Sequence, residues 1–458
     1  MALLDRIFKD DQTRGGRQTT GSSLISAMSP EVAAEYQELK FRVHNRLFEY
    51  IDFSRLSQIS HDRVLEDLSS LTRRILNEED HPFTKVEREQ LVVEIQNEVF
   101  GLGPLEPLLH DPTVSDILVN GPRDVFVERG GVIEPTIIEF KDDDHLLRII
   151  EKMLSTVGRR IDELTPYADA RLEDGSRVHA IIPPLALNGP TVSIRRFAAD
   201  PLTHEDLIGF GTISKECALV LEGIVRSRCN VLISGGTGCG KTTMLNVMSA
   251  FIPPTERIVT IEDSAELQLK QDHVVRLETR PPNVENKGRV TQRDLVINCL
   301  RMRPDRIVIG EVRGDEALDM LQAMNTGHDG SLTTIHANSA YDAVGRIETM
   351  VAMSGLDLPR RAIQQQVASA IDVVLQLTRF SDGSRRLISL MEIQGTEGDQ
   401  VVMKEIFKFR HTETDRSGRV HGDLVATGEK PKFLERFKLS GFDVSMSNFD
   451  APALGDGI

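Results

Sequence analysis

Residues 231–248 read VLISGGTGCGKTTMLNVM, and this stretch decides the fold. The phosphate-loop (P-loop) signature GxxxxGK(S/T) spans Gly235–Thr242 within it. The apolar run Val231–Ser234 predicts a strand before the loop, and the residues after Lys241 predict the helix that should follow. The alternative, a glycine-rich turn beside a surface lysine, does not account for this strand–loop–helix context. From residue 213 to about 380, short apolar strands alternate with helices, which predicts a parallel α/β core.

A P-loop binds the phosphates of a nucleotide through its backbone. Its glycines let the chain wrap closely around a pyrophosphate, and the following helix presents its positive dipole end. We expect Lys241 to reach the β- and γ-phosphates and Thr242 to place its hydroxyl on Mg²⁺. The implied ligands are ATP and Mg²⁺. The expected nucleotide-binding residues are Gly235, Gly236, Thr237, Gly238, Cys239, Gly240, Lys241, Thr242 and Thr243.

Two later strands are predicted to end in acidic residues. The run RIVTIEDSAEL carries Glu262, Asp263 and Glu266, and the run DRIVIGEVR carries Glu311. Ligands bind at the carboxyl edge of an open α/β sheet, so acids at strand ends there lie beside the P-loop. Such a carboxylate can coordinate Mg²⁺ through water or orient the water that attacks a γ-phosphate. The alternative, a pair of solvated acids, explains the pattern less well beside a P-loop.

A third strand is predicted in SLTTIHANS, with His328 before it and His336 at its end. A histidine at a strand end can sense a γ-phosphate. Histidines more often pack in a core or cap a helix, so the pattern alone favours a structural role.

The region between the strand of Glu262 and the strand of Glu311 is rich in basic residues. In an acidic chain such a cluster is either a solvated face or a phosphate clamp, acting across a subunit boundary as arginine fingers do. Its members are Arg276, Arg280, Lys287, Arg289, Arg293, Arg301 and Arg303.

The composition bounds the class of protein. The chain has 458 residues, with 54 Lys plus Arg against 70 Asp plus Glu, and its formal net charge is −16. This balance argues against direct nucleic-acid binding through broad phosphate neutralisation. No apolar run approaches the length of about 18 residues that a membrane span needs, and the N-terminal apolar stretch is too short for a signal peptide. We therefore expect a cytoplasmic protein without a transmembrane segment.

Changes in hydrophobic spacing and in turn residues along the chain predict its domains. Three amphipathic stripes, the last opening with a Thr84/Glu87 capping box, predict a helical bundle. Alternating strands and a hairpin at Asp174–Gly175 predict a small α+β domain. The expected division is a flexible lead at 1–29, the bundle at 30–100, the α+β domain at 101–197, a linker at 198–212, the P-loop domain with a C-terminal subdomain at 213–449 and a tail at 450–458.

Four motifs, in this order and spacing, resemble the secretion-ATPase superfamily of type II and type IV secretion: GGTGCGKTT, TIEDSAELQL, LRMRPDRIVIGEVRG and TGHDGSLTTIHANSA. The LETRPPN segment is most similar to the CpaF branch, which serves the Tad pilus. The resemblance covers residues 90 to 400. It implies an α/β fold, with a RecA-like P-loop ATPase core, an N-terminal α+β domain and, here, a preceding helical bundle.

The resemblance implies a homo-hexameric ring that hydrolyses ATP to ADP and phosphate. The ring would power Tad or type IV-like pilus assembly, or type II-like secretion, after peripheral recruitment to inner-membrane platform proteins. A conjugation-type (type IV secretion) ATPase is the alternative, although such ATPases usually lack the helical extension at 30–100. A nucleic-acid translocase on the same core fits the acidic charge poorly. The type II and type IVa extension branches usually carry a four-cysteine zinc module, whereas the cysteines here form no CxxC pair.

Mapped onto this chain, the resemblance also implies roles for residues. Gly310 stands where other P-loop enzymes carry a Walker B aspartate, so Mg²⁺ should rely more on Thr242 and the acids after the second strand. Basic residues of the N-terminal domain reach the phosphates in this family. The expected catalytic residues are Glu311 as base, Glu262, Asp263 and Glu266 as the Asp box, and His328 and His336 as the His box. The candidate arginine contacts are Arg171, Arg177, Arg195, Arg276 and Arg280.

Overall fold

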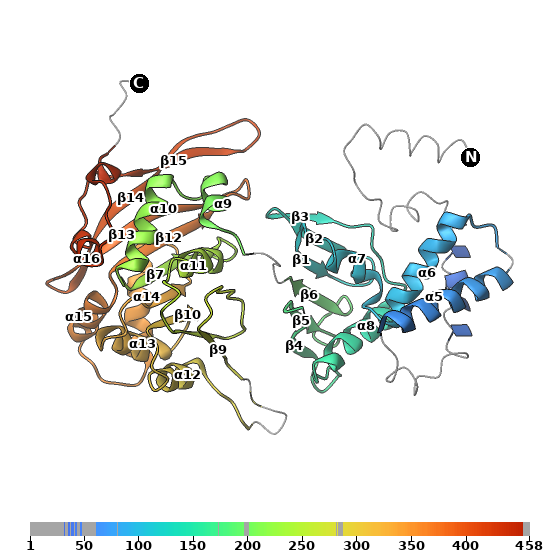
Figure 1. Ribbon diagram of the computed structural model, residues 1–458. Helices are drawn as coiled ribbons and strands as arrows, with labels where there is room; N and C mark the ends of the chain where they lie inside the picture. The colour runs from blue at the N-terminus through green and yellow to red at the C-terminus, as the bar shows by residue number, and fades with distance from the viewer. Residues whose placement is uncertain are drawn as a thin grey trace. The chain divides into compact units, whose positions relative to one another are not determined.

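The chain divides into two compact units, Met1–Ala198 and Ala199–Ile458, and each is considered by itself (Figure 1). The expected lead at 1–29 and most of the expected tail at 450–458 lie outside the described residues. The computed structural model describes residues 61–79, 81–172, 174–196, 201–280, 282 and 287–451, and single positions between 32 and 47.

The first unit begins with a helical bundle, as predicted. Helices α5 (His61–Glu78) and α6 (Lys85–Val99) pack against each other and against described helical positions between 32 and 47. The predicted capping box starts α6: the Thr84 hydroxyl accepts from the Glu87 N–H, and the Glu87 carboxylate accepts from the Thr84 N–H at 2.6 Å. The buried core of the bundle contains Tyr36, Leu39, Val43, Leu47, Leu68, Ile75, Leu76, Phe83, Leu91, Val92 and Ile95.

An antiparallel six-stranded sheet follows in the order β3-β2-β1-β6-β5-β4. Apolar residues on one face of the sheet pack against helix α8, whose N-cap Asp142 accepts from the His145 N–H. The expected hairpin at Asp174–Gly175 joins β4 to β5. The elements are η1 (Gly103–Leu105), α7 (Glu106–Leu109), β1 (Val114–Val119), β2 (Val125–Arg129), β3 (Val132–Pro135), α8 (Asp143–Thr156), β4 (Tyr167–Arg171), β5 (Arg177–Ile181) and β6 (Thr191–Arg195).

Glu98 of α6 connects the bundle to the α+β domain. Its Oε2 lies 3.0 Å from Nε2 of His145 in α8, and its Oε1 lies 3.2 Å from Nζ of Lys40. Burial alone would raise the pKa of Glu98, but hydrogen bonds and charges from His145 and Lys40 lower it to about 2. Lys152 of α8 adds hydrogen bonds from its Nζ to three backbone carbonyls at the C-terminal end of α6. The two N-terminal parts therefore share buried charged contacts.

The second unit is built on a nine-stranded sheet in the order β15-β14-β13-β12-β7-β11-β10-β8-β9. Strands β12 to β9 in this order pair in parallel, and β13, β14 and β15 extend the same sheet by antiparallel pairing. The strands are β7 (Val231–Gly235), β8 (Ile258–Glu262), β9 (Val274–Glu278), β10 (Arg306–Val312), β11 (Leu332–Ile335), β12 (Val373–Arg379), β13 (Arg385–Glu397), β14 (Gln400–Thr414) and β15 (Val420–Ala426).

Helices cover both faces of this sheet (Figure 1). Successive residues of β7 face opposite sides: Val231 and Ile233 belong to one core with α9, α10, α11 and α16, and Leu232 belongs to another with α12 to α15. The predicted α/β core is thus confirmed, and α9 occupies part of the segment expected as a linker. The helices are α9 (His204–Gly209), α10 (Lys215–Arg226), α11 (Lys241–Ser249), α12 (Gln292–Cys299), α13 (Glu316–Asn325), α14 (Ala340–Met353), α15 (Arg360–Ala370), α16 (Leu434–Leu439) and η2 (Met446–Phe449).

The cysteines lie in these cores. All four, Cys217, Cys229, Cys239 and Cys299, are free and buried. Burial raises the pKa of the Cys229 and Cys299 thiols to about 12. None of the four is therefore a reactive thiolate at neutral pH.

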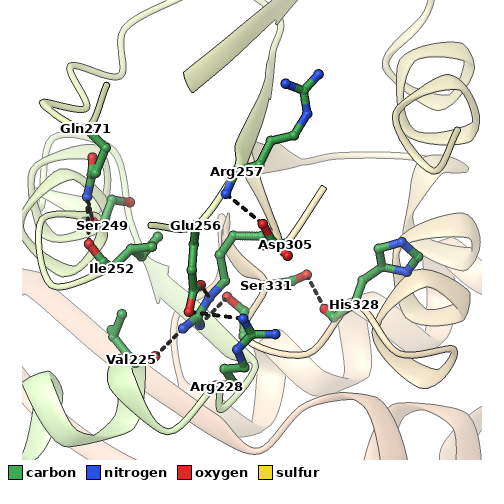
Figure 2. A network of polar contacts seen from close by, with 12 residues as sticks. Val225, Arg228, Ser249, Ile252, Glu256, Arg257, Gln271, Asp305, His328 and Ser331 are labelled. Carbon is green, nitrogen blue, oxygen red and sulfur yellow. Dashed lines mark hydrogen bonds and ion pairs between the residues drawn. The ribbon is translucent and has the colours of Figure 1, made fainter. Parts of the chain in front are cut away.

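A network of polar contacts around Glu256 joins segments at the amino edge of the parallel strands (Figure 2). The side chain of Arg306, the first residue of β10, is fully buried and donates from Nε to Glu256 at 2.5 Å. Its two other nitrogens donate to the carbonyl oxygens of Gly330, at 3.2 Å, and Val225, at 2.9 Å. Arg228 adds a second ion pair to Glu256 at 3.1 Å. These bonds tie together the segments that lead into β8, β10 and β11 and the end of α10.

We predict that Glu98→Gln destabilises the first unit by about 2 kcal/mol, because Lys40 and His145 lose a buried charged acceptor. The Glu98 pKa is depressed, so its stabilisation is present above about pH 4.5 and is lost as the pH falls towards 2. Hydrogen exchange of α6 and α8 in the full chain measures the effect. Glu89→Gln, which breaks an exposed pair with Arg73, is the control and should cost well under 1 kcal/mol. Equal protection of the α6 and α8 amides from hydrogen exchange in the two variants would contradict the role of Glu98.

Candidate functional site

The P-loop lies between β7 and α11, at the carboxyl edge of the parallel strands. Gly238 and Gly240 have φ angles of +68° and +97°, a left-handed conformation that favours glycine. A Cβ at Gly235 would lie 2.7 Å from the carbonyl oxygen of Leu377, so only glycine fits there. The Lys241 Nζ donates to the carbonyls of the first two loop glycines at 3.0 and 2.9 Å. The loop thus closes into a cradle at the N-terminus of α11, where an anion binds favourably.

Glu262 is the last residue of β8, and its side chain is inside the protein. Its Oε1 accepts hydrogen bonds from the backbone N–H groups of Glu266, at 2.8 Å, and Leu267, at 2.9 Å. Its Oε2 is buried and has no hydrogen-bond partner among the described residues. Burial raises the pKa of this carboxyl group, because the ionised form loses water, and the backbone hydrogen bonds and the charge of Arg276 offset that loss only in part.

Gly310 on the neighbouring strand β10 makes room for Glu262. A Cβ at Gly310 would lie 3.1 Å from Cγ of Glu262, closer than side chains normally pack. The Glu262 side chain therefore occupies the space that an aspartate at position 310 would need. In this chain the acidic side chain at this place is therefore Glu262 of β8 and not a residue of β10.

The groups at this edge fit a magnesium ion. Mg²⁺ prefers oxygen ligands, and a buried carboxylate oxygen without a partner is a costly arrangement that a cation would offset. Glu262 supplies that oxygen, and Thr242 supplies a hydroxyl in the first turn of α11. Among the described residues, these are the two that we expect to hold the ion.

Glu311 and Asp263, from the adjacent strands β10 and β8, are linked by Arg313. The Arg313 guanidinium lies 2.7 Å from Oε2 of Glu311 and 3.1 Å from Oδ2 of Asp263. The buried carboxylate of Glu316 holds the turn by accepting from the backbone N–H groups of Arg313 and Gly314. Sequence analysis missed Arg313 and Glu316, although both lie within or just after the GEVRG motif that it singled out. The arginine compensates the acidic charge at this edge.

The two predicted histidines lie at opposite edges of the sheet. His336 directly follows β11 and is half-buried at the carboxyl edge, together with the P-loop. His328 precedes β11 at the amino edge, where Ser331 donates to its carbonyl oxygen at 2.8 Å. Its imidazole points away from Glu256 (Figure 2). Within one protomer the structure therefore brings His336, but not His328, to the P-loop edge.

The three candidate arginines of the first unit form one row across its sheet. Arg171 of β4 is paired with Arg177 of β5, and Arg177 with Arg195 of β6. Arg195 lies 3.2 Å from a carboxylate oxygen of Asp116 on β1. Like charges directly opposite one another in a sheet are unfavourable, and a bound anion relieves the repulsion. The register therefore builds a cationic row on one face of the sheet.

The candidate arginines of the second unit bond to their own surroundings. Arg276 of β9 donates to the carbonyl oxygen of Leu267, and Arg280 donates to that of Gly288 at 2.6 Å. Both lie on the side of the sheet where β9 is the edge strand, beyond β8. The charge of Arg276 also offsets part of the rise in the Glu262 pKa that burial causes, and the role of both arginines as nucleotide contacts stays a prediction.

The sequence is similar to those of several known proteins. The family described as "Type II/IV secretion system protein" matches residues 98–421. A putative conjugal transfer protein of Mycobacterium tuberculosis is 40% identical over 310 residues, which cover 66% of this chain and 88% of that protein. The conjugal transfer protein TrbB of Rhizobium radiobacter is 30% identical, over 69% of this chain and 91% of its own. Among solved structures, the VirB11 ATPase of the Brucella suis type IV secretion system is 29% identical and covers 65% of this chain and 97% of its own, with a TM-score of 0.35.

None of the described helices is both long enough and apolar enough to cross a membrane.

We predict that Gly310→Ala displaces the Glu262 side chain by a few tenths of an ångström. Mg²⁺-dependent ATP binding should weaken about tenfold, as when the support of a metal ligand is lost, and unfolding should become easier by about 1 kcal/mol. Titration with ATP in the presence and absence of Mg²⁺ measures the first effect. Gly345→Ala in α14 is the control, because nothing lies within 4 Å of its added Cβ, and it should stabilise the helix. Unchanged Mg²⁺ dependence in Gly310→Ala would refute the steric role of Gly310.

Proposed function

The chain belongs to the type II/IV secretion system protein family, and from this premise we propose that it is an ATP-hydrolysing motor that works as a homo-hexameric ring. One observation carries the proposal. A closed P-loop, the buried Glu262 carboxylate and Glu311 all lie at the carboxyl edge of one parallel sheet. This edge is where open α/β sheets bind ligands.

The proposed chemistry is an in-line attack of water on the γ-phosphate of ATP. Lys241 leaves the loop carbonyls and contacts the β- and γ-phosphates when the nucleotide enters. Glu311 accepts the proton of the attacking water, and Arg313 orients its carboxylate at 2.7 Å. Mg²⁺, when bound, supplies positive charge to the phosphate oxygens, and Glu262 and Thr242 are the residues that would hold it.

The transition state carries more negative charge than Lys241 alone neutralises, and arginines commonly supply the remaining positive charge. The row Arg171–Arg177–Arg195 supports this role better than Arg276 or Arg280, because its register places three cations side by side. We infer that this row binds a nucleotide phosphate, as the family resemblance implies for basic residues of the N-terminal domain.

The secretion apparatus that this motor serves is a further part of the proposal. The relatives named above are conjugal transfer and type IV secretion proteins, and their names favour the conjugation-type alternative over the pilus-assembly expectation. Motor action in a conjugation-type or other type IV secretion system is therefore the first candidate. Tad-type pilus assembly is the second. It is favoured by helices α5 and α6, because nearly all of this bundle precedes residue 98, where the family match begins.

We propose that the ring is cytoplasmic and is recruited to inner-membrane platform proteins. A net charge of −16 opposes attraction to anionic lipid or to nucleic acid, so recruitment should depend on a protein partner.

Light scattering with and without Mg²⁺–ATP, combined with phosphate release from the same sample, tests the motor. We expect a mass near six protomers with steady turnover in the wild type. Lys241→Ala should abolish turnover with the fold intact, and Glu311→Gln should bind ATP but hydrolyse it very slowly. Full turnover in Lys241→Ala would disprove the assignment of the site. A monomer without turnover would instead disprove the ring motor.

Arg177, in the middle of the arginine row, offers a separate test. We predict that Arg177→Gln lowers kcat by about 10³-fold, as expected for an arginine that stabilises the transition state. Unfolding free energy should change by less than about 0.5 kcal/mol, because the site is on the surface of the sheet. Arg148→Gln, on the exposed side of α8, is the matched control and should leave turnover unchanged. Equal turnover in both variants would exclude the row from catalysis.

A further inference from the structure

The β12–β13 hairpin continues past the end of β7 and lies against the P-loop. Strand β12 pairs with β7 up to Leu377, which lies opposite Gly235, the first glycine of the loop. The hairpin then extends two residues further, where Arg379 of β12 lies opposite Arg385 of β13. Two arginines that belong to no nucleotide-binding motif are thus placed beside the loop.

Arg385 bonds directly to the backbone of the P-loop. Its Nε donates to the carbonyl oxygen of Gly238 at 2.8 Å. Its Cδ lies 3.6 Å from the position that a Cβ on Gly240 would take. Arg379 approaches from the paired strand, with a guanidinium nitrogen 3.2 Å from the Cβ position of Gly238. The hairpin therefore covers the two left-handed glycines of the loop.

This bond fixes the orientation of a peptide group that contacts phosphate in P-loops. In a trans peptide the carbonyl and the following N–H point in opposite directions. With the Gly238 carbonyl held toward Arg385, the Cys239 N–H points to the opposite side. A glycine with φ of +68° has little conformational preference of its own, so an external bond is needed to select this orientation.

Arg385 itself is held in place by bonds outside the P-loop. The Thr212 hydroxyl donates to the Arg385 carbonyl at 2.8 Å, and the Leu387 N–H donates to the Thr212 carbonyl at 3.0 Å. The hairpin turn is fixed by Asp382, which accepts from the backbone N–H groups of Ser384 and of Val420 in β15. The arginine is therefore preorganised, and the segment after α9 takes part in holding it.

We propose that Arg385 is a positioning residue for phosphate binding, which orients the Gly238–Cys239 peptide so that its N–H faces the anion. The inference rests on the proposed nucleotide site and adds to it a group 147 positions away in sequence from the loop glycine that it holds. Arg385 should act on the affinity for the β-phosphate, which ADP and ATP share. It should leave the hydrolysis step nearly unchanged, because Glu311 lies on the other side of β7 in the sheet order.

The test compares Arg385→Gln with Arg386→Gln in the full chain. Arg386 is its neighbour in the same hairpin and donates to the carbonyls of Gly211 and Val420, so its loss loosens the hairpin without touching the P-loop. Calorimetric titration with Mg²⁺–ATP and Mg²⁺–ADP gives Kd, and phosphate release gives KM and kcat. We expect Arg385→Gln to weaken both nucleotides about tenfold or more, the effect of losing a charged hydrogen bond, with kcat at saturating ATP within about threefold of wild type.

Each outcome decides the inference. Wild-type Kd values in Arg385→Gln would overturn it, and so would an equal loss of affinity in Arg386→Gln, since hairpin rigidity would then explain the effect. Lys241→Ala serves as the reference for complete loss of nucleotide binding. A wild type that binds neither nucleotide would overturn the proposed function, and the positioning role with it, whereas a wild type that binds both leaves the comparison to judge Arg385 alone.

Discussion

The arrangement of the site depends on one buried cation, Arg306. Removing a guanidinium from water costs several kcal/mol, and Glu256 together with two backbone carbonyls offsets that cost. Because these partners come from the segments before β8 and β11 and from the end of α10, the arginine sets where neighbouring strands begin. The register of β8 with β10, which pairs Ile258 with Arg306 and Ile261 with Ile309, carries this alignment towards the carboxyl edge. The residues at the opposite edge, Glu262 and Glu311 among them, therefore meet beside the P-loop.

The P-loop is supported from both sides by residues outside its signature. On one side, β8 supplies the acid that β10 lacks, and Gly310 leaves the space for it. Arg313 balances the remaining acidic charge between these two strands. On the other side, Arg385 holds a loop carbonyl from the β12–β13 hairpin. The signature provides the cradle, while the neighbouring strands provide a buried carboxylate, the charge balance and an arginine that bonds to the loop backbone.

Local sequence patterns were sufficient to predict the parts of the structure that are contiguous in sequence. Gly235–Thr242 could be recognised because the strand, the loop and the helix follow one another directly, and the start of α6 followed from its capping box. The contact between Glu262 and Gly310 depends on the pairing of β8 with β10, which no local pattern specifies. His328 borders a strand as closely as a site residue would, but the direction of that strand places it at the far edge. Arg385 belongs to no motif, and only the register of the hairpin reveals it.

The burial of all four thiols has a practical consequence for labelling chemistry. Maleimide reagents attack exposed thiolates, and these cysteines are covered, with Cys229 and Cys299 held protonated well above neutral pH. A single cysteine introduced at an exposed position of each unit would then carry a fluorophore while the native residues stay in their cores. Energy transfer between two such dyes would report any change in the distance between the units when a nucleotide is added, without first replacing residues on which the packing depends.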